Sequence, residues 1–547
     1  MKIFGTTFPF VESGSAGDER LGRLVANYEF LKSLLNYSSF DQFHLFCLSP
    51  THAQITINKL KSDTSISDTA KQKIAIFLYD KLKQQLQTSV YHCFHLGGWS
   101  YHFNGTVYLR NTYAKEAFPV TGIIHSLNAT AMSSYVQGLI RSNAQEYDSV
   151  FCTSNDGKEV MRKKIAIAED LDKMAKYCGK LSHLPLGYDF RLTPSSANKR
   201  LTKASMGFER DAKIILYLGR LSPSTKADLY PLLLVFKSLK ERVNFKIKLV
   251  LAGGANANEQ RMHKDIIHEL GLDNDVYLMA NFDLANKQAL ISSADVCVAP
   301  SDNIQETFGI SVIEAAACGV PVVAADIDGY KDLVVQNETG FKIKTTWIDE
   351  FEPSETDDLY DFSVMQIMLA QAMAIDCDEM EEKIHLLLTN DGLRQEMGEN
   401  AAKRAVENYR WDIVIKQYEK EWDLLKELAV KTGKPKEIMP NPYSNHYLQT
   451  FSHYPTQIFN ENLILQLTSD GEKVVNNTQK IPQIYGDCSM MLDLDYLRKI
   501  MEYLSQNGAK TVKNLFVKYP DNHTKGRFTI LWAVKYRLLR FVEEANK

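Results

Sequence analysis

Apolar residues in the first part of the chain alternate between two spacings, one typical of strands and one typical of helices. The segment Lys2–Phe8 is short and β-rich, and in the following Asp18–Leu35 the apolar residues recur at helical spacing. This alternation of strand and helix then repeats. The further strand-like runs are Gln42–Leu48, Val90–His95, Val120–His125 and Ser149–Thr153. The helical stretches between them include Asp68–Gln87 and Ala129–Arg141. Strands that alternate with helices predict a parallel α/β sheet.

A second alternating series follows the polar stretch Arg191–Arg210. Its strands are expected at Lys213–Leu218, Lys246–Ala252, Val276–Met279, Val296–Ala299, Val320–Ala324 and Phe341–Ile343, with helices between them. The sequence therefore predicts two α/β sheets in tandem.

The last part of the chain has a different pattern. Asp412–Ala429 is a long helical stretch, and Lys431–Tyr443 carries three prolines and no apolar periodicity, which indicates a linker. Beyond it, three helices are expected at Leu492–Ser505, Thr511–Tyr519 and Phe528–Glu544.

Composition narrows the class of protein. Of 547 residues, 45% are hydrophobic and 24% are charged, so a large core can form. The 63 Lys and Arg residues nearly balance the 67 Asp and Glu residues, which leaves no chain-wide field to attract nucleic acid. The eight cysteines include no Cys-x-x-Cys pair, and no run is apolar enough to cross a membrane. We expect a cytoplasmic protein, in solution or peripheral to the inner face of the membrane.

Two carboxylates stand out in the run SDNIQETFGISVIEA after the strand that ends near Pro300. If a helix opens at Phe308 or Gly309, Glu314 lies in its early turns and Glu306 in the loop before it. Both would face the carboxyl ends of the strands, where open α/β sheets bind ligands. The amides of Phe308, Gly309 and Ile310 would offer a phosphate site, and carboxylates accept from sugar hydroxyls. Without further evidence, this spacing is equally typical of two ordinary glutamates near the start of a helix, with no role in binding.

Cations follow another predicted strand. In LYLGRLSPSTK, Arg220 comes directly after the strand and Lys226 lies six residues later. Such a pair could neutralise a leaving diphosphate without a metal, although Lys226 could equally be a solvated loop cation. In LAGG, Gly253 and Gly254 end a further strand and allow a ligand to approach the backbone.

Together these pieces resemble glycosyltransferase family 4, a group of retaining GT-B enzymes. The motifs that carry the resemblance are YLGRLSPSTK, LVLAGG, QETFGISVIEAAACGVPVVAADIDGYKDLV and NETGFKI, with VTGIIHSLN, YDSVFCTS and LPLGYDF in the first half. The resemblance covers roughly residues 1 to 430. It implies an α/β protein of the GT-B fold, with two Rossmann-like parallel-sheet domains that face a cleft, plus a small and mostly helical C-terminal module.

The expected domains follow from this resemblance and the linker. They are an acceptor domain at residues 1–205, a nucleotide-sugar domain at 206–410, a crossover helix at 411–430, a linker at 431–445 and an accessory module, of winged-helix type, at 446–547.

The resemblance also implies roles for single residues. Arg220 and Lys226 would hold the diphosphate, Glu314 the ribose and Glu306 the hydroxyls of the donor sugar. His125 matches the family histidine that faces the reacting sugar, although it could also be a buried structural histidine; His95 is a second candidate. The other residues expected to bind the donor are Gly14, Gly17, Gly219, Gly253, Gly254, Asn281, Phe282, Thr307, Phe308, Gly309 and Ile310.

Two positions depart from the family pattern. Many members place the lysine five residues after the arginine, whereas here the interval is six, which puts the role of Lys226 in doubt. The residue after the first glutamate is often Gly, whereas this chain has Thr307.

The expected function is that of a retaining glycosyltransferase that moves a sugar from a UDP-, GDP- or ADP-linked donor, with no metal and no other cofactor. The acceptor could be a glycan, a lipid, a small molecule or a peptide. Alternatives are another GT-B enzyme, such as a nucleotide-sugar epimerase or a phosphorylase, and a non-catalytic scaffold that binds nucleotide sugars.

The C-terminal region is locally basic. From Arg498 onward it has eleven Lys or Arg residues against four Asp or Glu residues. Such a surface could dock an acceptor or a partner. The partners that would suit it are an acidic peptide, nucleic acid or membrane headgroups. The basic residues could instead simply form a solvated face. The basic run KEVMRKK at Lys158–Lys164 could likewise contact an anionic membrane, or it could be a solvated face.

Overall fold

The computed structural model describes residues 1–8, 10–11, 22–190, 199–350, 359–441, 444–520 and 523–542. It divides into two compact units. Unit 1 comprises Met1–Leu45, Leu60–Ala75 and Lys83–Pro442, and unit 2 comprises Phe46–Lys59, Ile76–Leu82 and Tyr443–Lys547.

The first sheet has seven strands in the order β3-β2-β1-β4-β5-β6-β7, and the strands from β2 to β7 in this order pair in parallel. The strands are β1 (Ile3–Thr6), β2 (Gln42–Cys47), β3 (Ile74–Leu78), β4 (Cys93–Leu96), β5 (Val120–Ile123), β6 (Ser149–Cys152) and β7 (Lys180–His183). The helices between them are α1 (Gly22–Tyr37), α2 (Pro50–Ser62), α3 (Asp68–Gln72), α4 (Leu82–Thr88), α5 (Trp99–Tyr113), α6 (Met132–Ile140) and α7 (Asn155–Leu171). Since β1, β4, β5 and β6 are buried throughout, the sheet forms a continuous core.

One expectation for this sheet was wrong. Asp68–Gln87 was expected to be a helix, but the segment contains α3, the edge strand β3 and the start of α4. The apolar run IAIFL of β3 lies beside β2 in the sheet. A short apolar run has no clear period, so pairing with a neighbouring strand overrides the helical pattern around it.

The second sheet repeats this order with six parallel strands, β10-β9-β8-β11-β12-β13. They are β8 (Lys213–Leu218), β9 (Ile247–Gly253), β10 (Val276–Ala280), β11 (Val296–Ala299), β12 (Val322–Ala325) and β13 (Gly340–Ile343). The helices around them are α8 (Lys199–Ser205), α9 (Tyr230–Arg242), α10 (Ala257–Glu269), α11 (Lys287–Ser293), α12 (Ile310–Ala317), α13 (Tyr330–Leu333), α15 (Cys377–Thr389) and α16 (Asp391–Tyr409). A hairpin of β14 (Thr345–Trp347) and β15 (Met373–Ile375) and the helix α14 (Phe362–Gln371) complete this half.

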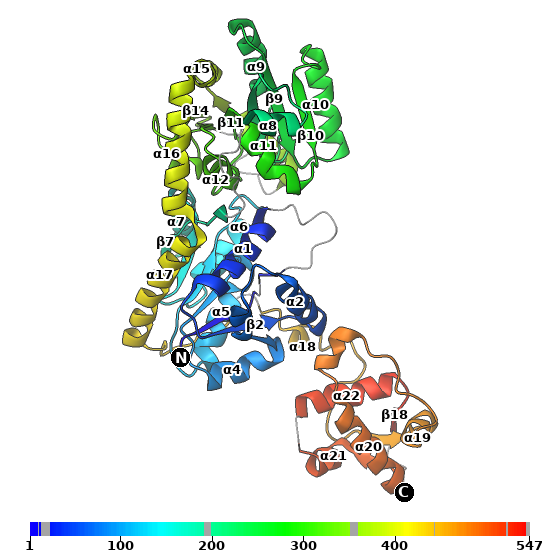
Figure 1. Ribbon diagram of the computed structural model, residues 1–547. Helices are drawn as coiled ribbons and strands as arrows, with labels where there is room; N and C mark the ends of the chain where they lie inside the picture. Colours follow the sequence, from blue (N-terminus) through cyan, green and yellow to red (C-terminus); the bar gives the residue numbers. More distant parts are fainter. Residues whose placement is uncertain are drawn as a thin grey trace. The chain divides into compact units, whose positions relative to one another are not determined.

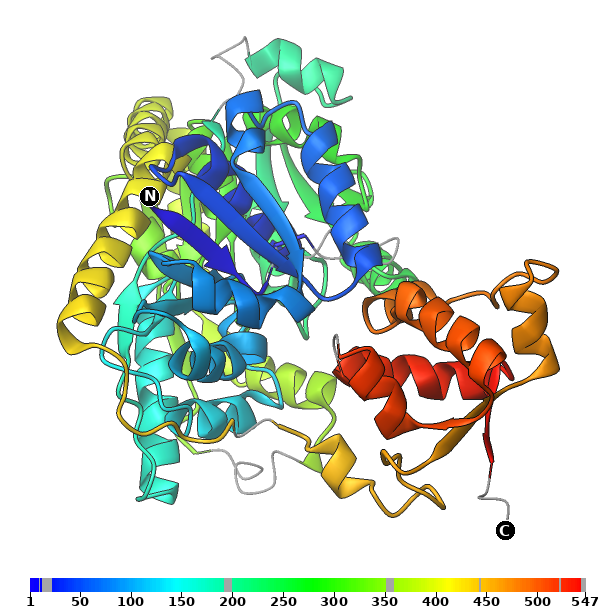
Figure 2. The same ribbon diagram turned by 90° about the horizontal axis from the view of Figure 1, so that it is seen from below.

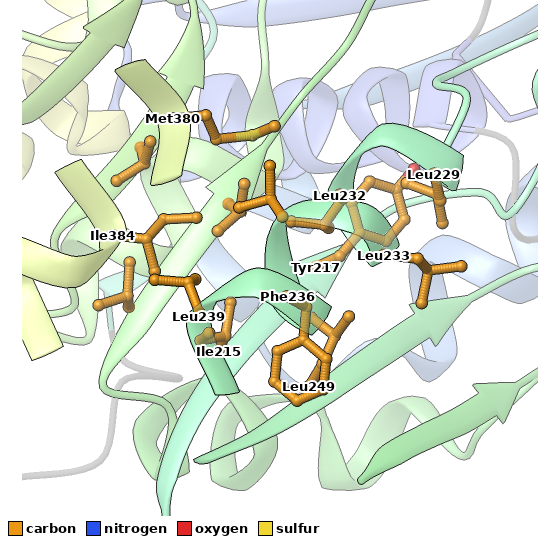
Figure 3. Packing of buried hydrophobic residues seen from close by; sticks show 14 of the residues in the cluster. Ile215, Tyr217, Leu229, Leu232, Leu233, Phe236, Leu239, Leu249, Met380 and Ile384 are labelled. Carbon is orange, nitrogen blue, oxygen red and sulfur yellow. The ribbon is translucent and has the colours of Figure 1, made fainter. Parts of the chain in front are cut away.

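The core of this half lies between β8, α9 and α15. Ile215 and Tyr217 of β8 meet Leu232 and Phe236 of α9, and Ile384 of α15 closes the cluster (Figure 3). In both sheets the strand order reverses beside the first strand, so the crevice between β8 and β11 is the place where such a sheet binds a ligand.

A long helix runs back from the second sheet to the first. Helix α17 (Trp411–Thr432) follows α16 directly, and both appear in yellow along one side of the two sheets in Figures 1 and 2. Trp422 of α17 is fully buried, and its indole nitrogen donates to the Thr121 hydroxyl on β5 at 3.0 Å. The helix is therefore packed into the core of the first sheet.

The C-terminal part of unit 2 has a core of its own. Helices α19 (Ser469–Val475), α20 (Leu494–Asn507), α21 (Val512–Lys518) and α22 (His523–Lys535) pack with an antiparallel sheet, β17 (Lys510–Thr511), β16 (Ile464–Leu467) and β18 (Leu539–Val542). A short helix, α18 (Tyr447–Thr450), precedes them. The helix expected at Phe528–Glu544 was therefore wrong beyond Lys535, because Arg537 takes a left-handed φ of 63° and the chain continues as β18.

Candidate functional site

A cavity of about 610 Å³ in unit 1 is lined by residues of both sheets. On the second sheet's side, it lies where β8, β9 and β11 end, at the crevice that the strand order predicts. Apart from His95, every site residue expected from the sequence that the structure describes lines this cavity. They are His125, Gly219, Arg220, Lys226, Gly253, Gly254, Asn281, Phe282, Glu306, Thr307, Phe308, Gly309, Ile310 and Glu314. Gly14 and Gly17 lie outside the described residues.

Arg220 is fixed through its backbone to the core of the second sheet. The Tyr217 hydroxyl donates to the Arg220 carbonyl at 2.7 Å, and the Arg220 guanidinium donates to the Thr225 carbonyl at 2.9 Å. Since Tyr217 is buried in the β8–α9 cluster, the strand end determines where this cation sits. The planar Arg220 guanidinium has further N–H groups that can donate to an anion.

Lys226 and Glu306 form an ion pair in the cavity, and the Lys226 ammonium also lies 3.3 Å from the Tyr330 hydroxyl. Both charged side chains are mostly buried, with 14% and 16% of their surface exposed. Burial alone would raise the pKa of Glu306, but the charge and hydrogen bond of Lys226, the Phe308 amide and the Arg220 charge together outweigh it, and the pKa lies below its usual range. Glu306 is therefore an ionised acceptor at neutral pH.

The amide of Phe308 has a different partner from the expected phosphate. It donates to the Glu306 carboxylate at 3.3 Å, so it helps to hold this side chain. In the structure without a ligand, Phe308 therefore stabilises the carboxylate that would contact the sugar.

Gly309 begins helix α12 and needs to be glycine for two reasons. Its φ is 104°, in the left-handed region, and a Cβ atom would come within 2.6 Å of the Tyr330 ring. The turn places Glu314 in the second turn of α12, with 8% of its side chain exposed. Glu314 pairs with Lys287 of α11 at 2.5 Å.

The second glycine turn brings two strands of the sheet close together. A Cβ atom on Gly253 would come within 1.7 Å of the Gly219 carbonyl oxygen, so no other residue fits. Gly253 in turn accepts from the amide of Asn281 at 2.7 Å, and Asn281 itself has a left-handed φ of 55°. The three turns after β8, β9 and β10 are therefore packed into one floor of the cavity.

His125 lies on the opposite side of the cavity, just after β5. Its Nε2 atom lies 2.6 Å from the Gly97 carbonyl oxygen, and because a carbonyl only accepts, this nitrogen carries the proton. Burial lowers the pKa of His125 to about 4, so the ring is neutral at pH 7 and its Nδ1 atom is an acceptor.

His95, the second histidine candidate, does not line the cavity. It is fully buried among aromatic side chains, and its Nδ1 atom lies 2.9 Å from the Thr121 hydroxyl. Burial lowers its pKa to about 3, as is typical of a neutral core histidine.

Several residues that hold the site together were not predicted from the sequence. After β11, Ser301 donates to the Lys226 carbonyl at 2.7 Å and Asn303 to the Ser224 carbonyl at 2.8 Å, and Asp302 accepts from the Asp228 amide at 3.2 Å. The run Ser301–Asn303 therefore holds the loop that carries Lys226. These residues are all buried, and buried polar residues directly after a strand are the signal that could have found them.

Asp328 is a further carboxylate close to the site. Burial raises its pKa to about 8, and the charges of Glu306 and Asp156 add to this effect. Its carboxylate lies 3.4 Å from the Ser154 hydroxyl at the start of α7.

The first sheet's side of the cavity is mostly apolar. It is lined by Arg23, Val25, Ala26, Trp99, Ile123, Ala129, Met132 and Tyr135, beside His125.

The described ranges offer neither a candidate metal site nor a candidate membrane-spanning helix. No group of three or more His, Cys, Asp or Glu side chains in them is placed to hold a metal ion. No helix in the same ranges combines the length and the apolar character needed to cross a bilayer.

Sequence comparison finds glycosyltransferases. The family described as "Glycosyl transferases group 1" matches residues 198–353. An uncharacterised glycosyltransferase of Methanocaldococcus jannaschii is 24% identical over 63% of this chain and 78% of its own length. A D-inositol 3-phosphate glycosyltransferase of Stackebrandtia nassauensis is 30% identical, but the match spans only 32% of this chain and 41% of that relative.

Structural comparison finds the same fold. A sucrose-phosphate synthase from Thermosynechococcus elongatus has a TM-score of 0.53 and 18% identity over 78% of this chain and all of its own. A glycosyltransferase from Rickettsia africae has a TM-score of 0.52 and 16% identity over 78% of this chain and 98% of its own. Anabaena HepE, solved with UDP, has a TM-score of 0.50 and 17% identity over 77% of this chain and 99% of its own. These similarities confirm the GT-B fold expected from the sequence, and residues 198–353 match the glycosyl transferases group 1 family.

Proposed function

We propose that the protein is a retaining glycosyltransferase that moves a sugar from a nucleotide-sugar donor to an acceptor hydroxyl. The observation that carries this proposal is the arrangement of charge in the cavity. Arg220 and Lys226 lie at the end of the nucleotide-binding strands, Glu306 and Glu314 flank the start of α12, and His125 faces them from the first sheet. Cations suit a diphosphate, and buried carboxylates suit the hydroxyls of ribose and hexose.

The proposed reaction breaks the bond between the anomeric carbon and the diphosphate oxygen. Negative charge then develops on the leaving diphosphate, and Arg220 and Lys226 stabilise it at fixed positions. Glu306 accepts from hydroxyls of the donor sugar, and the neutral His125 offers Nδ1 as a further acceptor. In a front-face reaction the acceptor oxygen bonds to the same face of the anomeric carbon, and its proton passes to the departing diphosphate.

UDP-sugars are the first donors to test. HepE, which shares the fold, was solved with UDP. We propose a UDP-linked donor on this ground, with GDP- and ADP-linked sugars as the alternatives. The eight free cysteines support the cytoplasmic location proposed for the enzyme.

The test begins with the intact protein and a thermal-shift screen of UDP-, GDP- and ADP-sugars, because a ligand that binds the native state raises its apparent stability. Turnover of the donor that binds is then measured for Arg220→Ala and Glu306→Ala, with Arg261→Ala on the exposed face of α10 as the matched control. We expect both site variants to lose about 100-fold or more of the activity, as is usual for groups that stabilise transition-state charge. Wild-type turnover in both would contradict the proposal.

Product analysis separates the proposed reaction from the other GT-B activities. A transferase yields a nucleoside diphosphate and a new glycoside, a phosphorylase consumes phosphate, and an epimerase alters the sugar. Donor binding without any product, under all acceptor conditions, would favour a non-catalytic scaffold.

A second proposal concerns the basic C-terminal module, which we propose docks the acceptor or a partner protein. A cavity of about 670 Å³ lies between α19, the segment that follows it and α20, with Lys480 and Arg498 among its lining residues. Cations beside an apolar floor of Val474, Leu494 and Met501 suit an acidic, partly apolar ligand.

A further inference from the structure

A further cation on the second sheet's side, Lys287, lines the cavity with Arg220 and Lys226. Lys287 is the first residue of α11, and its ammonium lies 2.5 Å from the Glu314 carboxylate. It belongs to none of the motifs by which the sequence resembles glycosyltransferases. The pair lies 27 positions apart in the chain and joins the starts of two helices.

Lys287 compensates the burial of Glu314. Burial raises the pKa of this carboxylate, and Lys287 is the strongest influence that opposes it, ahead of Lys226. The thiols of Cys297 and Cys318 also lie close enough for their titration to respond to Glu314. A buried carboxylate without a cation is costly, so Lys287 favours the ionised form, which accepts hydrogen bonds.

The backbone that carries Lys287 is held from two sides. The neighbouring Gln288 donates to the Tyr188 hydroxyl at 2.5 Å, and the Cys318 thiol lies 3.3 Å from the Gln288 side-chain oxygen. Lys287 therefore starts from a fixed turn, and its stem leads to Glu314 within the cavity.

The pair has the hydrogen-bonding capacity that a vicinal diol needs. A carboxylate has two accepting oxygens, and an ammonium has three donors, of which one serves Glu314. Each hydroxyl of a ribose both donates and accepts. Glu314 can accept from the diol, and a remaining N–H of Lys287 can donate to it.

We propose that Lys287 is a specificity-determining residue of the donor site: together with Glu314 it binds the ribose diol, and so the site selects ribonucleoside over 2′-deoxyribonucleoside diphosphates. This inference rests on the proposed function, because it needs a nucleotide in this cavity. It concerns a different ion pair of the cavity from Lys226–Glu306.

The experiment measures the affinity of each nucleotide by titration calorimetry on the intact protein. The probes are UDP, GDP and ADP, each with its 2′-deoxy counterpart, and the quantity compared is the ratio of the two dissociation constants. The variants are Lys287→Met, which keeps the length of the side chain without the charge, and Lys287→Arg, which keeps the charge. Lys264→Met, an exposed lysine on α10, is the matched control.

For the wild type, we expect the 2′-deoxy form of the preferred nucleotide to bind about tenfold more weakly, as loss of a hydrogen bond to charged groups predicts. In Lys287→Met the ratio should fall to about threefold or less, while Lys287→Arg and Lys264→Met keep it. A double variant, Lys287→Met with Glu314→Gln, removes both charges and guards against a single variant that fails to fold. It too should bind the two forms alike.

An unchanged ratio in Lys287→Met, or in the folded double variant, would overturn this inference and leave the proposed function intact. A merely structural role predicts this outcome, because both forms of the nucleotide would then weaken equally. If the wild type binds none of the three nucleotides, the proposed function itself fails, and the inference falls with it.

Discussion

The Lys226 ammonium and the Glu306 carboxylate neutralise each other inside the cavity, although 80 positions separate them in the chain. Each is the nearest compensation for the burial of the other. In the proposed reaction, a donor diphosphate would offer Lys226 a new anionic partner, and Glu306 would then be available to the sugar.

Removal of one member of this pair is expected to cost more stability than removal of both. Lys226→Met leaves an uncompensated carboxylate, and we expect its free energy of unfolding to fall by about 2–3 kcal/mol. The double variant Lys226→Met with Glu306→Gln should recover most of this loss in urea unfolding and still show no turnover. A double variant as unstable as the single one would show that the two side chains are not coupled.

The close approach of two glycine turns leads to a second prediction. Gly253→Ala would force a methyl group against the Gly219 carbonyl oxygen, at 1.7 Å, and so displace the turn that carries Arg220. We expect nucleotide affinity to fall by at least about tenfold in calorimetry, since a small displacement of a positioning group has a large effect.

Gly271→Ala is the control for this change. Gly271 also has a left-handed φ, of 70°, but open space surrounds the position of its Cβ atom. It should lose only about 1 kcal/mol of stability from backbone strain and keep its nucleotide affinity. Equal effects of the two substitutions would assign the loss to backbone conformation, not to the contact with Gly219.

Both glycine turns and both carboxylates were predictable from the sequence because they are local features at strand ends. The motif around Glu306 sits directly after a strand, and the order of α/β strands places all such ends at one edge of a sheet. The partner of each carboxylate was not predictable. Lys287 meets Glu314 only because α11 and α12 pack side by side, and one sequence carries no signal for such a contact.

The same limit explains the errors in the fold. Most strands of the two parallel sheets were predicted within a few residues, because buried strands are continuous apolar runs, but β7 was not among the predicted strands. The edge strands β3 and β18 were taken for helix, since each is a short apolar run flanked by helical residues. Their state depends on a neighbouring strand, which the local pattern does not show.

Asp328 leads to a prediction for the effect of pH on stability. Burial raises its pKa to about 8, far above the usual value of 3.8, so the folded protein holds a proton that the unfolded chain releases. The stabilisation is complete below about pH 4 and is lost as pH rises through about 8. We expect the melting temperature of Asp328→Asn, relative to the wild type, to increase between pH 5 and pH 9.

Asparagine suits this test because it keeps the shape of the protonated acid and tolerates the φ of 41° at this position. Asp265→Asn, on the exposed face of α10, is the control and should show no such trend. A constant difference between Asp328→Asn and the wild type across this range would mean that Asp328 is ionised throughout.

His125 is expected to affect turnover more than nucleotide binding. It lies on the first sheet's side of the cavity, and the residues that we propose bind the nucleotide lie on the other side. We expect His125→Ala to lower kcat by about 100-fold and to change the dissociation constant of the nucleoside diphosphate by less than about threefold. Burial holds the pKa of His125 near 4, so His125 does not titrate between pH 6 and 7. The pH profile of kcat should therefore have the same shape in this range for the wild type and for His125→Ala. A variant that loses nucleotide affinity and kcat equally would place His125 at the nucleotide.

The C-terminal module is expected to fold by itself. Its core consists of buried residues from Leu465 to Leu539, and three of its largest members, Tyr496, Phe516 and Trp532, come from three different helices. A fragment of residues 444–547 therefore contains every residue of this core, and we expect a cooperative thermal transition by circular dichroism.

The complementary chain, residues 1–440, should still hydrolyse the donor at the wild-type rate, while its transfer to the acceptor falls because docking is lost. If transfer by the shortened chain equals that of the full chain, the module does not dock the acceptor; if the fragment shows no cooperative transition, its core depends on the rest of the protein.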